Sequence, residues 1–109
     1  MTDNFKNIIN GSTPVLVDFS AEWCAPCRMM APVLKQLKER TGEELKIIKI
    51  DIDKNNHLAG LFNIRSVPTL MLFRSGSVLW SGSGIMTSEY LENVINNYCN
   101  FSSAEKISS

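Results

Sequence analysis

The strongest constraint on the fold is the run Val15-Leu16-Val17-Asp18-Phe19, which is rich in β-branched residues and nearly all apolar. It lacks the alternation of polar and apolar residues that marks a strand with one wet face. The run therefore predicts a central β-strand whose two faces are both covered by other elements.

Helix and strand signals alternate around this run. The spacing of apolar residues predicts helices over 4–10 and 25–40 and a short helix over 58–62. A last helix is expected to begin at Thr87 or Ser88, and its buried face should contain Leu91, Val94, Ile95 and Tyr98. Further strands are expected over 45–52, 69–73 and 78–81. Asp53 or an adjacent Asn is the expected cap of the short helix.

The order of these segments predicts an α/β fold with a central mixed sheet of four or five strands and helices on both faces. We expect parallel pairing and right-handed crossovers among the first three strands. A hairpin at Ser75-Gly76 adds an antiparallel edge. The length of 109 residues suits one domain, expected over residues 1–101, with a fraying serine-rich tail over 102–109.

Charge and hydropathy exclude several classes of partner. Eleven basic and eleven acidic residues give a formal net charge of zero, so nothing in the composition favours nucleic acid or an anionic membrane surface. No apolar run approaches the roughly 18 residues of a membrane span, and the amino terminus lacks the pattern of a secretory signal. We expect a cytoplasmic protein, and the balanced charge of one small domain favours a monomer.

The segment Cys24-Ala25-Pro26-Cys27 lies where the first strand passes into the long helix. A thiol at a helix amino terminus faces unpaired amides and the positive end of the helix dipole, which lowers its pKa. We therefore expect Cys24 to be an exposed thiolate, and Cys27, one turn later, to be shielded and more protonated. Pro26 stiffens the ring between the two sulfurs and donates no amide.

Three interpretations of the cysteine pair compete. A structural zinc site needs four ligands, and Cys99 and His57 are the only further candidates, without a second closely spaced pair. A purely structural disulfide gains little from so short a loop and is unusual without an export signal. A dithiol/disulfide redox couple without a metal is the interpretation we favour.

The segment Trp23-Cys24-Ala25-Pro26-Cys27 resembles the W-C-G-P-C motif of the thioredoxin family, with Ala25 in place of the usual glycine. The likeness extends over about residues 4 to 98. It includes Val17-Asp18-Phe19, Ala31-Pro32, Val67-Pro68-Thr69, Gly76 and Gly84. Ser20 departs from it, because many thioredoxins have an aromatic residue there, and the site beside Asp18 is expected to be more open or more polar. The first strand of longer thioredoxins has little counterpart here.

The resemblance implies roles that spacing alone does not supply. Cys24 is implied as the attacking nucleophile, Cys27 as the resolving thiol, and Asp18 as a buried carboxylate that takes the Cys27 proton through water. Pro68 is implied as a cis-proline that faces the disulfide. A shallow substrate groove is implied around the sulfur, formed by Trp23, Ser66, Val67, Pro68, Gly84 and Ile85. Ala25, Pro26 and Lys49 are the residues expected to tune the redox chemistry.

The residues themselves agree with the role of Asp18. A carboxylate in an apolar strand is costly unless it has a partner, and burial raises its pKa towards the range of a base at neutral pH. The alternative is an edge position that faces water. Lys49, in the next strand, is the natural partner of Asp18, and its alternative is an ordinary exposed strand position.

The functional hypothesis is a protein-disulfide reductase that acts by dithiol–disulfide exchange on disulfide-containing proteins. By resemblance, a separate flavin-containing thioredoxin reductase fed by NADPH restores the dithiol, and this chain binds no cofactor itself. An oxidase or isomerase of the same fold is one alternative, and a redox-inert binding module is another.

Overall fold

The computed structural model describes residues 2–99 and contains every helix and strand that the sequence predicts, with bounds that differ by a few residues. In chain order the elements are α1 (Thr2–Ile9), β1 (Val15–Ser20), α2 (Ala25–Thr41), a short 3-10 helix (Gly42–Glu44), β2 (Lys46–Asp51), α3 (Asn56–Leu61), β3 (Thr69–Arg74), β4 (Ser77–Ser83) and α4 (Ser88–Cys99). The expected domain limit at residue 101 and the tail over 102–109 lie outside the described residues.

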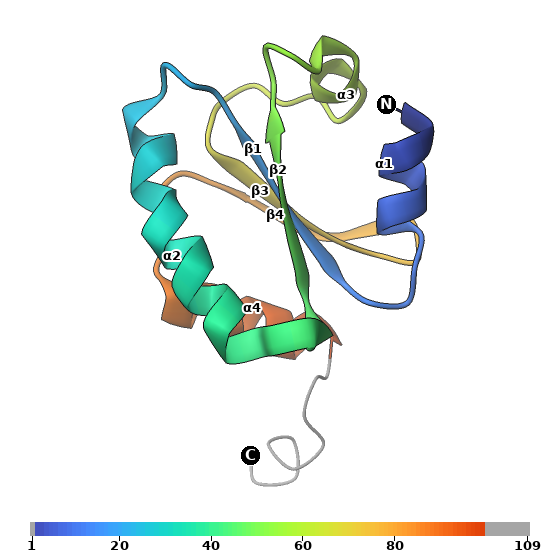
Figure 1. Ribbon diagram of the computed structural model, residues 1–109, viewed down its shortest axis with the longest axis vertical. Coiled ribbons are helices and arrows are strands. Elements are labelled where there is room, and N and C mark those ends of the chain that lie inside the picture. The colour runs from blue at the N-terminus through green and yellow to red at the C-terminus, as the bar shows by residue number, and fades with distance from the viewer. Residues whose placement is uncertain (1, 100–109) are drawn as a thin grey trace, which may run out of the picture.

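The four strands form one sheet in the order β2-β1-β3-β4. All six residues of β1 are buried, which confirms that this strand is central and covered on both faces. Four or five strands were possible from the sequence, and residues 2–99 contain four. β1 is therefore an inner strand, and the loop that follows it begins between neighbouring strands at one end of the sheet (Figure 1).

The direction of β3 corrects the expectation of parallel pairing among the first three strands. β2 pairs with β1 in parallel, but β3 pairs with β1 antiparallel. The register shows why: Ser20, at the end of β1, pairs with Asp51 at the end of β2, and Phe19 pairs with Thr69 at the start of β3. α3 has only six residues and does not cross the sheet as a long crossover helix does, and the chain enters β3 from the end of the sheet at which it left β2.

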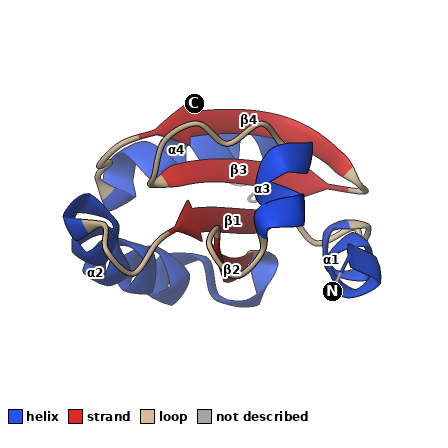
Figure 2. Ribbon diagram, turned by 90° about the horizontal axis from the view of Figure 1, so that it is seen from above, coloured by secondary structure: helices blue, strands red, loops and turns tan. Residues whose placement is uncertain are grey.

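Helices cover both faces of the sheet, as expected. α2 and α4 pack against one face, where the buried core contains Leu16, Met30, Leu37, Leu70, Leu72, Leu91 and Ile95. α1 and α3 cover the other face, where the core contains Phe5, Val17, Phe19, Leu58 and Phe73. The two layers are visible in Figure 1 and, from above, in Figure 2. No helix among residues 2–99 is long and apolar enough to cross a membrane.

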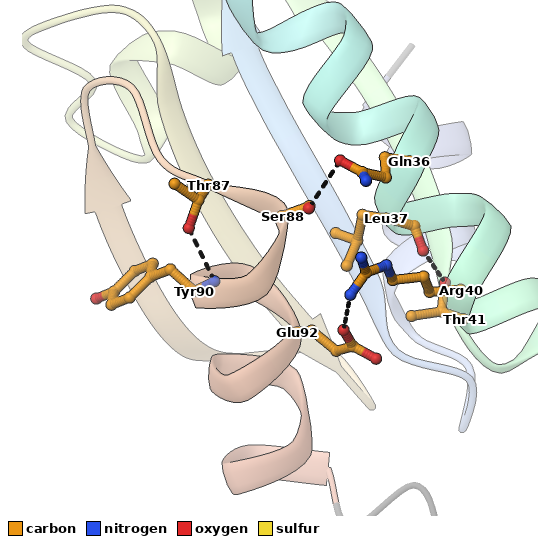
Figure 3. Close-up of polar contacts among 8 residues, drawn as sticks. All are labelled: Gln36, Leu37, Arg40, Thr41, Thr87, Ser88, Tyr90 and Glu92. Carbon is orange, nitrogen blue, oxygen red and sulfur yellow. Dashed lines mark hydrogen bonds and ion pairs between the residues drawn. The ribbon is translucent and has the colours of Figure 1, made fainter.

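Polar contacts join α2 to the start and middle of α4 (Figure 3). The Ser88 hydroxyl lies 2.9 Å from Oε1 of Gln36 and donates to it. Arg40 forms an ion pair with Glu92 at the same distance. Thr87 caps α4, because its hydroxyl oxygen accepts a hydrogen bond from the amide of Tyr90 at 3.1 Å. These contacts fix the register of the helix that carries the cysteine pair at its other end.

Two local expectations are wrong. Tyr98 does not belong to the buried stripe of α4, since it is 49% exposed and Cys99 takes the buried position. Residues 91, 95 and 99 follow one another at a spacing of four, so Tyr98 lies beside that row.

At α3, Asn55 occupies the cap position without a side-chain cap bond, because its side-chain amide donates to the Asp51 carbonyl instead.

Candidate active site

The transition from β1 to α2 places both cysteines in the first turn of a helix. Cys24 is the N-cap residue of α2, in an extended conformation, and Pro26 occupies the first turn, where a missing amide costs no helical bond. The Cys27 amide donates a hydrogen bond to Sγ of Cys24 at 3.2 Å. The sulfur of Cys24 therefore takes the place of the side-chain oxygen that ordinarily caps a helix.

Cys24 and Cys27 form a disulfide bond, with their Cα atoms 5.3 Å apart. The expectation that Cys24 is exposed is wrong for this state, because Cys24 is only 4% exposed and Cys27 is 2% exposed. Ala21 and the partly buried Ile52 and Val67 pack around the pair and cover it. The neighbouring Trp23, in contrast, is 68% exposed.

The loop before β3 lies against the sulfur of Cys24. The Val67–Pro68 peptide bond is cis, and the Val67 carbonyl oxygen lies 3.7 Å from Sγ of Cys24. The Pro68 carbonyl in turn accepts a hydrogen bond from the Gly84 amide at 2.9 Å. These contacts bring together three segments that are far apart in the sequence, namely the cysteine pair, the cis-proline loop and the loop after β4.

Two other residues of the implied substrate groove, Ser66 and Ile85, are exposed. Ile85 is 53% exposed, beside Gly84. Ser66 is exposed, and its carbonyl accepts a hydrogen bond from the Thr69 hydroxyl. A pocket of about 420 Å³ opens between β4 and the start of α4 and includes Ile85, but neither cysteine lines it.

Asp18 is buried on β1, as expected, and is 2% exposed. Burial raises the pKa of its carboxyl from 3.8 to about 6, and the positive charge of Lys49 opposes that rise. Oδ1 of Asp18 has no hydrogen-bond partner among the described residues. A carboxyl with this pKa is largely ionised at neutral pH and can still accept and release a proton there.

Lys49 lies opposite Asp18 on the neighbouring strand. It pairs with Asp18 in the register of β1 and β2, so the two side chains lie on the same face of the sheet. Its side chain is nevertheless exposed. The positive charge of Lys49 thus acts on Asp18 from an exposed position.

Two contacts of the site are absent from the sequence-based prediction. The Trp23 indole N–H donates to Oδ2 of Asp53 at 2.8 Å, whereas the sequence suggests Asp53 only as a helix cap. The Val67 backbone carbonyl, and not only its side chain, approaches Cys24. Neither contact has a local sequence signal, because each joins residues at least 30 positions apart.

The third cysteine of the chain, Cys99, does not belong to this pair. Cys99 is a buried free cysteine at the end of α4; burial raises the pKa of its thiol, and Arg74 opposes the rise. Among residues 2–99 no group of three or more His, Cys, Asp or Glu side chains is placed to hold a metal ion.

Comparisons with known proteins show which family the chain is similar to. A family model described as Thioredoxin matches residues 1–97. A thioredoxin of Listeria monocytogenes is 48% identical over 84 residues, which cover 77% of this chain and 82% of the relative. A thioredoxin of Bacillus subtilis is 43% identical over 84 residues and covers 77% and 81% of the two chains. The solved structure of a mutant thioredoxin from Halobacterium salinarum NRC-1 aligns with a TM-score of 0.81 and 35% identity, over 89% of this chain and 84% of that one.

Proposed function

This chain belongs to the thioredoxin family and is a protein-disulfide reductase that works by dithiol–disulfide exchange, and we propose which of its residues performs each step of the reaction. The observation that carries the proposal is the Cys24–Cys27 disulfide at the amino terminus of α2, with the cis-proline loop against Sγ of Cys24. Two sulfurs in this position can exchange between dithiol and disulfide without unfolding the helix.

Cys24 is the nucleophile. In the reduced protein, the helix amino terminus and the Cys27 amide favour the thiolate form of Cys24. The thiolate attacks one sulfur of a substrate disulfide, forms a mixed disulfide and releases the other substrate sulfur as a thiolate.

Cys27 resolves this intermediate, and Asp18 is its base. Asp18 takes the Cys27 proton through a water molecule, and the Cys27 thiolate then attacks the sulfur of Cys24. The Cys24–Cys27 disulfide forms and the second substrate sulfur leaves. The substrate has gained two electrons and the two cysteines have lost two. The raised pKa of Asp18, about 6, supports this role, because a base is most effective when its pKa lies near the working pH.

Substrate proteins bind as extended segments across the groove formed by Trp23, Ser66, Val67, Pro68, Gly84 and Ile85. The contacts from Cys24 to Val67 and from Pro68 to Gly84 support a continuous surface around the sulfur. Main-chain hydrogen bonds give affinity to such a segment, while shallow apolar contacts allow many sequences.

A separate flavin-containing thioredoxin reductase, fed by NADPH, returns the protein to the dithiol form. The chain holds no cofactor in this scheme, and it works as a monomer in the cytoplasm. Ala25 and Pro26, between the cysteines, and Lys49, beside Asp18, set the redox potential. The reducing direction rests on Ala25-Pro26, because oxidases and isomerases of this fold often have a histidine there.

Reduction of insulin disulfides tests the mechanism. We expect Cys24→Ser to abolish turnover, because the attacking sulfur is lost. Cys99→Ser is the matched control, since it removes a cysteine on α4 away from the site, and it should keep the wild-type rate. Undiminished turnover by Cys24→Ser discards the mechanism.

A further inference from the structure

β4 is the last strand of the sheet, and among the described residues no strand pairs with its outer edge. Hydrogen-bonded and free positions alternate along an antiparallel pair of strands. The Gly84 amide donates to the Pro68 carbonyl, so the main-chain groups of Gly84 and Gly82 face β3. The N–H and C=O groups of Ser81 and Ser83 therefore point away from β3, and both residues are exposed. This short segment can accept a further strand.

A pocket lies on each face of the sheet beside these two serines. The pocket of about 420 Å³ and a second pocket of about 210 Å³ both include Ser81 and Ser83 in their walls. Trp80, in the larger pocket, packs against the core under α2 and α4, whereas Met71, in the smaller one, packs against the core under α1 and α3. Successive side chains of a strand point to opposite faces of its sheet. Neighbouring side chains of a strand added to β4 thus enter the two pockets in turn.

The larger pocket is apolar and aromatic. Its wall includes Trp80, Met86 and the half-exposed Tyr90, whose ring extends from α4 towards β4 (Figure 3). The ring centroids of Trp80 and Tyr90 lie 6.4 Å apart. Gly82 makes room for the Trp80 ring, because a Cβ atom at Gly82 would lie 2.6 Å from a ring atom. The pocket suits an apolar or aromatic side chain.

The smaller pocket is polar and carries a positive charge. Arg65 lines it, is exposed, and has no ion-pair partner among residues 2–99. The Thr69 hydroxyl donates to the Ser66 carbonyl at 2.7 Å, so it accepts from the Ser83 hydroxyl at 3.0 Å. These groups make the wall of the pocket polar. An arginine binds a carboxylate through two parallel hydrogen bonds, so the pocket suits an acidic side chain.

Both pockets are continuous with the substrate groove. Ile85 of the groove lines the larger pocket, and Ser66 of the groove lines the smaller one. β4 ends at Ser83, and Gly84 of the groove is the next residue. A segment that leaves the groove therefore reaches the open edge of β4 directly.

We propose that β4 extends the substrate groove: a protein substrate pairs as an added strand with Ser81 and Ser83, with an apolar side chain in the larger pocket and a carboxylate beside Arg65. The inference rests on the proposed function, in which Cys24 captures a cysteine of the substrate. It defines the preferred substrates as proteins whose reactive cysteine adjoins an extended segment of alternating apolar and acidic residues. Main-chain hydrogen bonds supply the affinity of such a strand, and the pockets for alternate side chains supply its selectivity.

The test attaches such a segment to Cys24 and observes β4. Cys27→Ser removes the resolving sulfur, so a mixed disulfide at Cys24 persists. The probes are synthetic peptides of alternating Leu and Glu with one cysteine at either end, activated as a mixed disulfide with thionitrobenzoate. The Cys24 thiolate attacks the peptide sulfur, and thionitrobenzoate leaves as a thiolate. The tether holds the peptide at a high effective concentration beside the groove.

Amide hydrogen exchange of the tethered protein, followed by NMR, is the measurement. The Ser81 and Ser83 amides face solvent in the free protein. With at least one of the two peptides they should exchange roughly fivefold more slowly, the effect of one hydrogen bond of ordinary strength. The Gly82 amide faces β3 and is the internal reference, which should not change. A tethered peptide of alternating Gly and Ser should protect neither serine.

Substitutions in the Cys27→Ser protein test the two pockets. Arg65→Glu should lose the protection with the Glu peptide and regain it with a peptide that has Lys in place of Glu. Lys35→Glu is the control, because it makes the same change of charge at an exposed position of α2 outside the pocket. Tyr90→Ala should reduce the protection, whereas Tyr98→Ala, about equally exposed on α4 but outside the pocket, should not.

The possible failures are distinguishable. Unchanged exchange at Ser81 and Ser83 with the peptides bound to Cys24 overturns the role of β4, while Cys24 remains the nucleophile. A failure of Cys24 to release thionitrobenzoate overturns the proposed function, and the role of β4 with it. Protection that is present without a peptide and grows with protein concentration assigns the edge to a second copy of the chain, which also overturns the proposal.

Discussion

The indole N–H of Trp23 donates a hydrogen bond to the Asp53 carboxylate, and the two atoms lie 2.8 Å apart. The ring stays 68% exposed although it is the residue next to Cys24. The bond therefore orients a large apolar surface beside the reactive sulfur without burying it. A ring that is already oriented loses less entropy when a substrate segment packs on it.

Removal of the Asp53 carboxylate should weaken substrate binding more than chemistry. We expect Asp53→Ala to raise KM for a protein disulfide roughly threefold, the effect of a partly solvated hydrogen bond, and to leave kcat nearly unchanged. Steady-state insulin reduction measures both constants. Asp53→Asn is the control, because its side-chain oxygen can still accept from the indole. An equal KM for the wild type and Asp53→Ala contradicts a platform role for the ring.

Local sequence patterns predict the parts of this molecule that depend on local burial. The apolar run around Asp18 correctly predicts a central strand, and the same burial correctly predicts a raised pKa for Asp18. Pro26 and the apolar spacing that follows it correctly predict that α2 begins at the cysteine pair. In each case the cause and its effect lie within a few residues of one another.

Features set by distant segments are missing from the prediction or wrong in it. The burial of Cys24 depends on Val67, which reaches it from the loop before β3. The direction of β3 depends on its pairing with β1, which lies about 50 residues earlier in the chain. The partner of Trp23 follows β2, thirty residues later. Patterns within a window of the sequence do not contain these relationships.

The buried carboxyl of Asp18 should lower the stability of the protein at neutral pH. Its pKa is about 6 in the folded state, against an ordinary value of 3.8. The folded state therefore binds more protons than the unfolded state between these values, and the free energy of unfolding falls as the pH rises from about 4 to above 6. Two pKa units correspond to about 3 kcal/mol as an upper bound.

Urea unfolding of the wild type and Asp18→Asn at pH 3.5 and pH 8 measures this effect. We expect the variant to gain stability relative to the wild type by about 2–3 kcal/mol between the two pH values. Only the change with pH is used, because the amide also alters contacts that do not titrate. Glu43→Gln, at an exposed position in the 3-10 helix, is the control for the loss of one carboxylate charge. A wild-type stability that rises from pH 4 to pH 6 relative to Asp18→Asn contradicts a raised pKa.

Asp18→Asn should also slow the resolution of the mixed disulfide. A positioned base typically contributes a hundredfold or more, and water can replace part of it, so we expect a loss of roughly 10- to 100-fold at pH 7. Stopped-flow release of a chromogenic thiol from Cys24 measures the step. The wild-type rate should rise with pH through about 6 and then level off, whereas the variant should lack that rise. Equal rates at pH 7 remove Asp18 from the mechanism.

Gly84 joins the cis-proline loop to the loop after β4 in a conformation that suits glycine alone. Its φ is +92°, and a Cβ atom there would meet nothing within 4 Å, so backbone strain is the only obstacle to a side chain. We expect Gly84→Ala to lower the free energy of unfolding by about 1–2 kcal/mol. We also expect it to raise KM for protein disulfides, because the hydrogen bond from the Gly84 amide to the Pro68 carbonyl must shift.

Gly60→Ala is the matched control, since Gly60 lies in α3 with equal space and without a positive φ. It should stabilise the protein by up to about 1 kcal/mol and leave KM unchanged. Equal effects of the two substitutions on KM would show that the Gly84 backbone does not shape the groove.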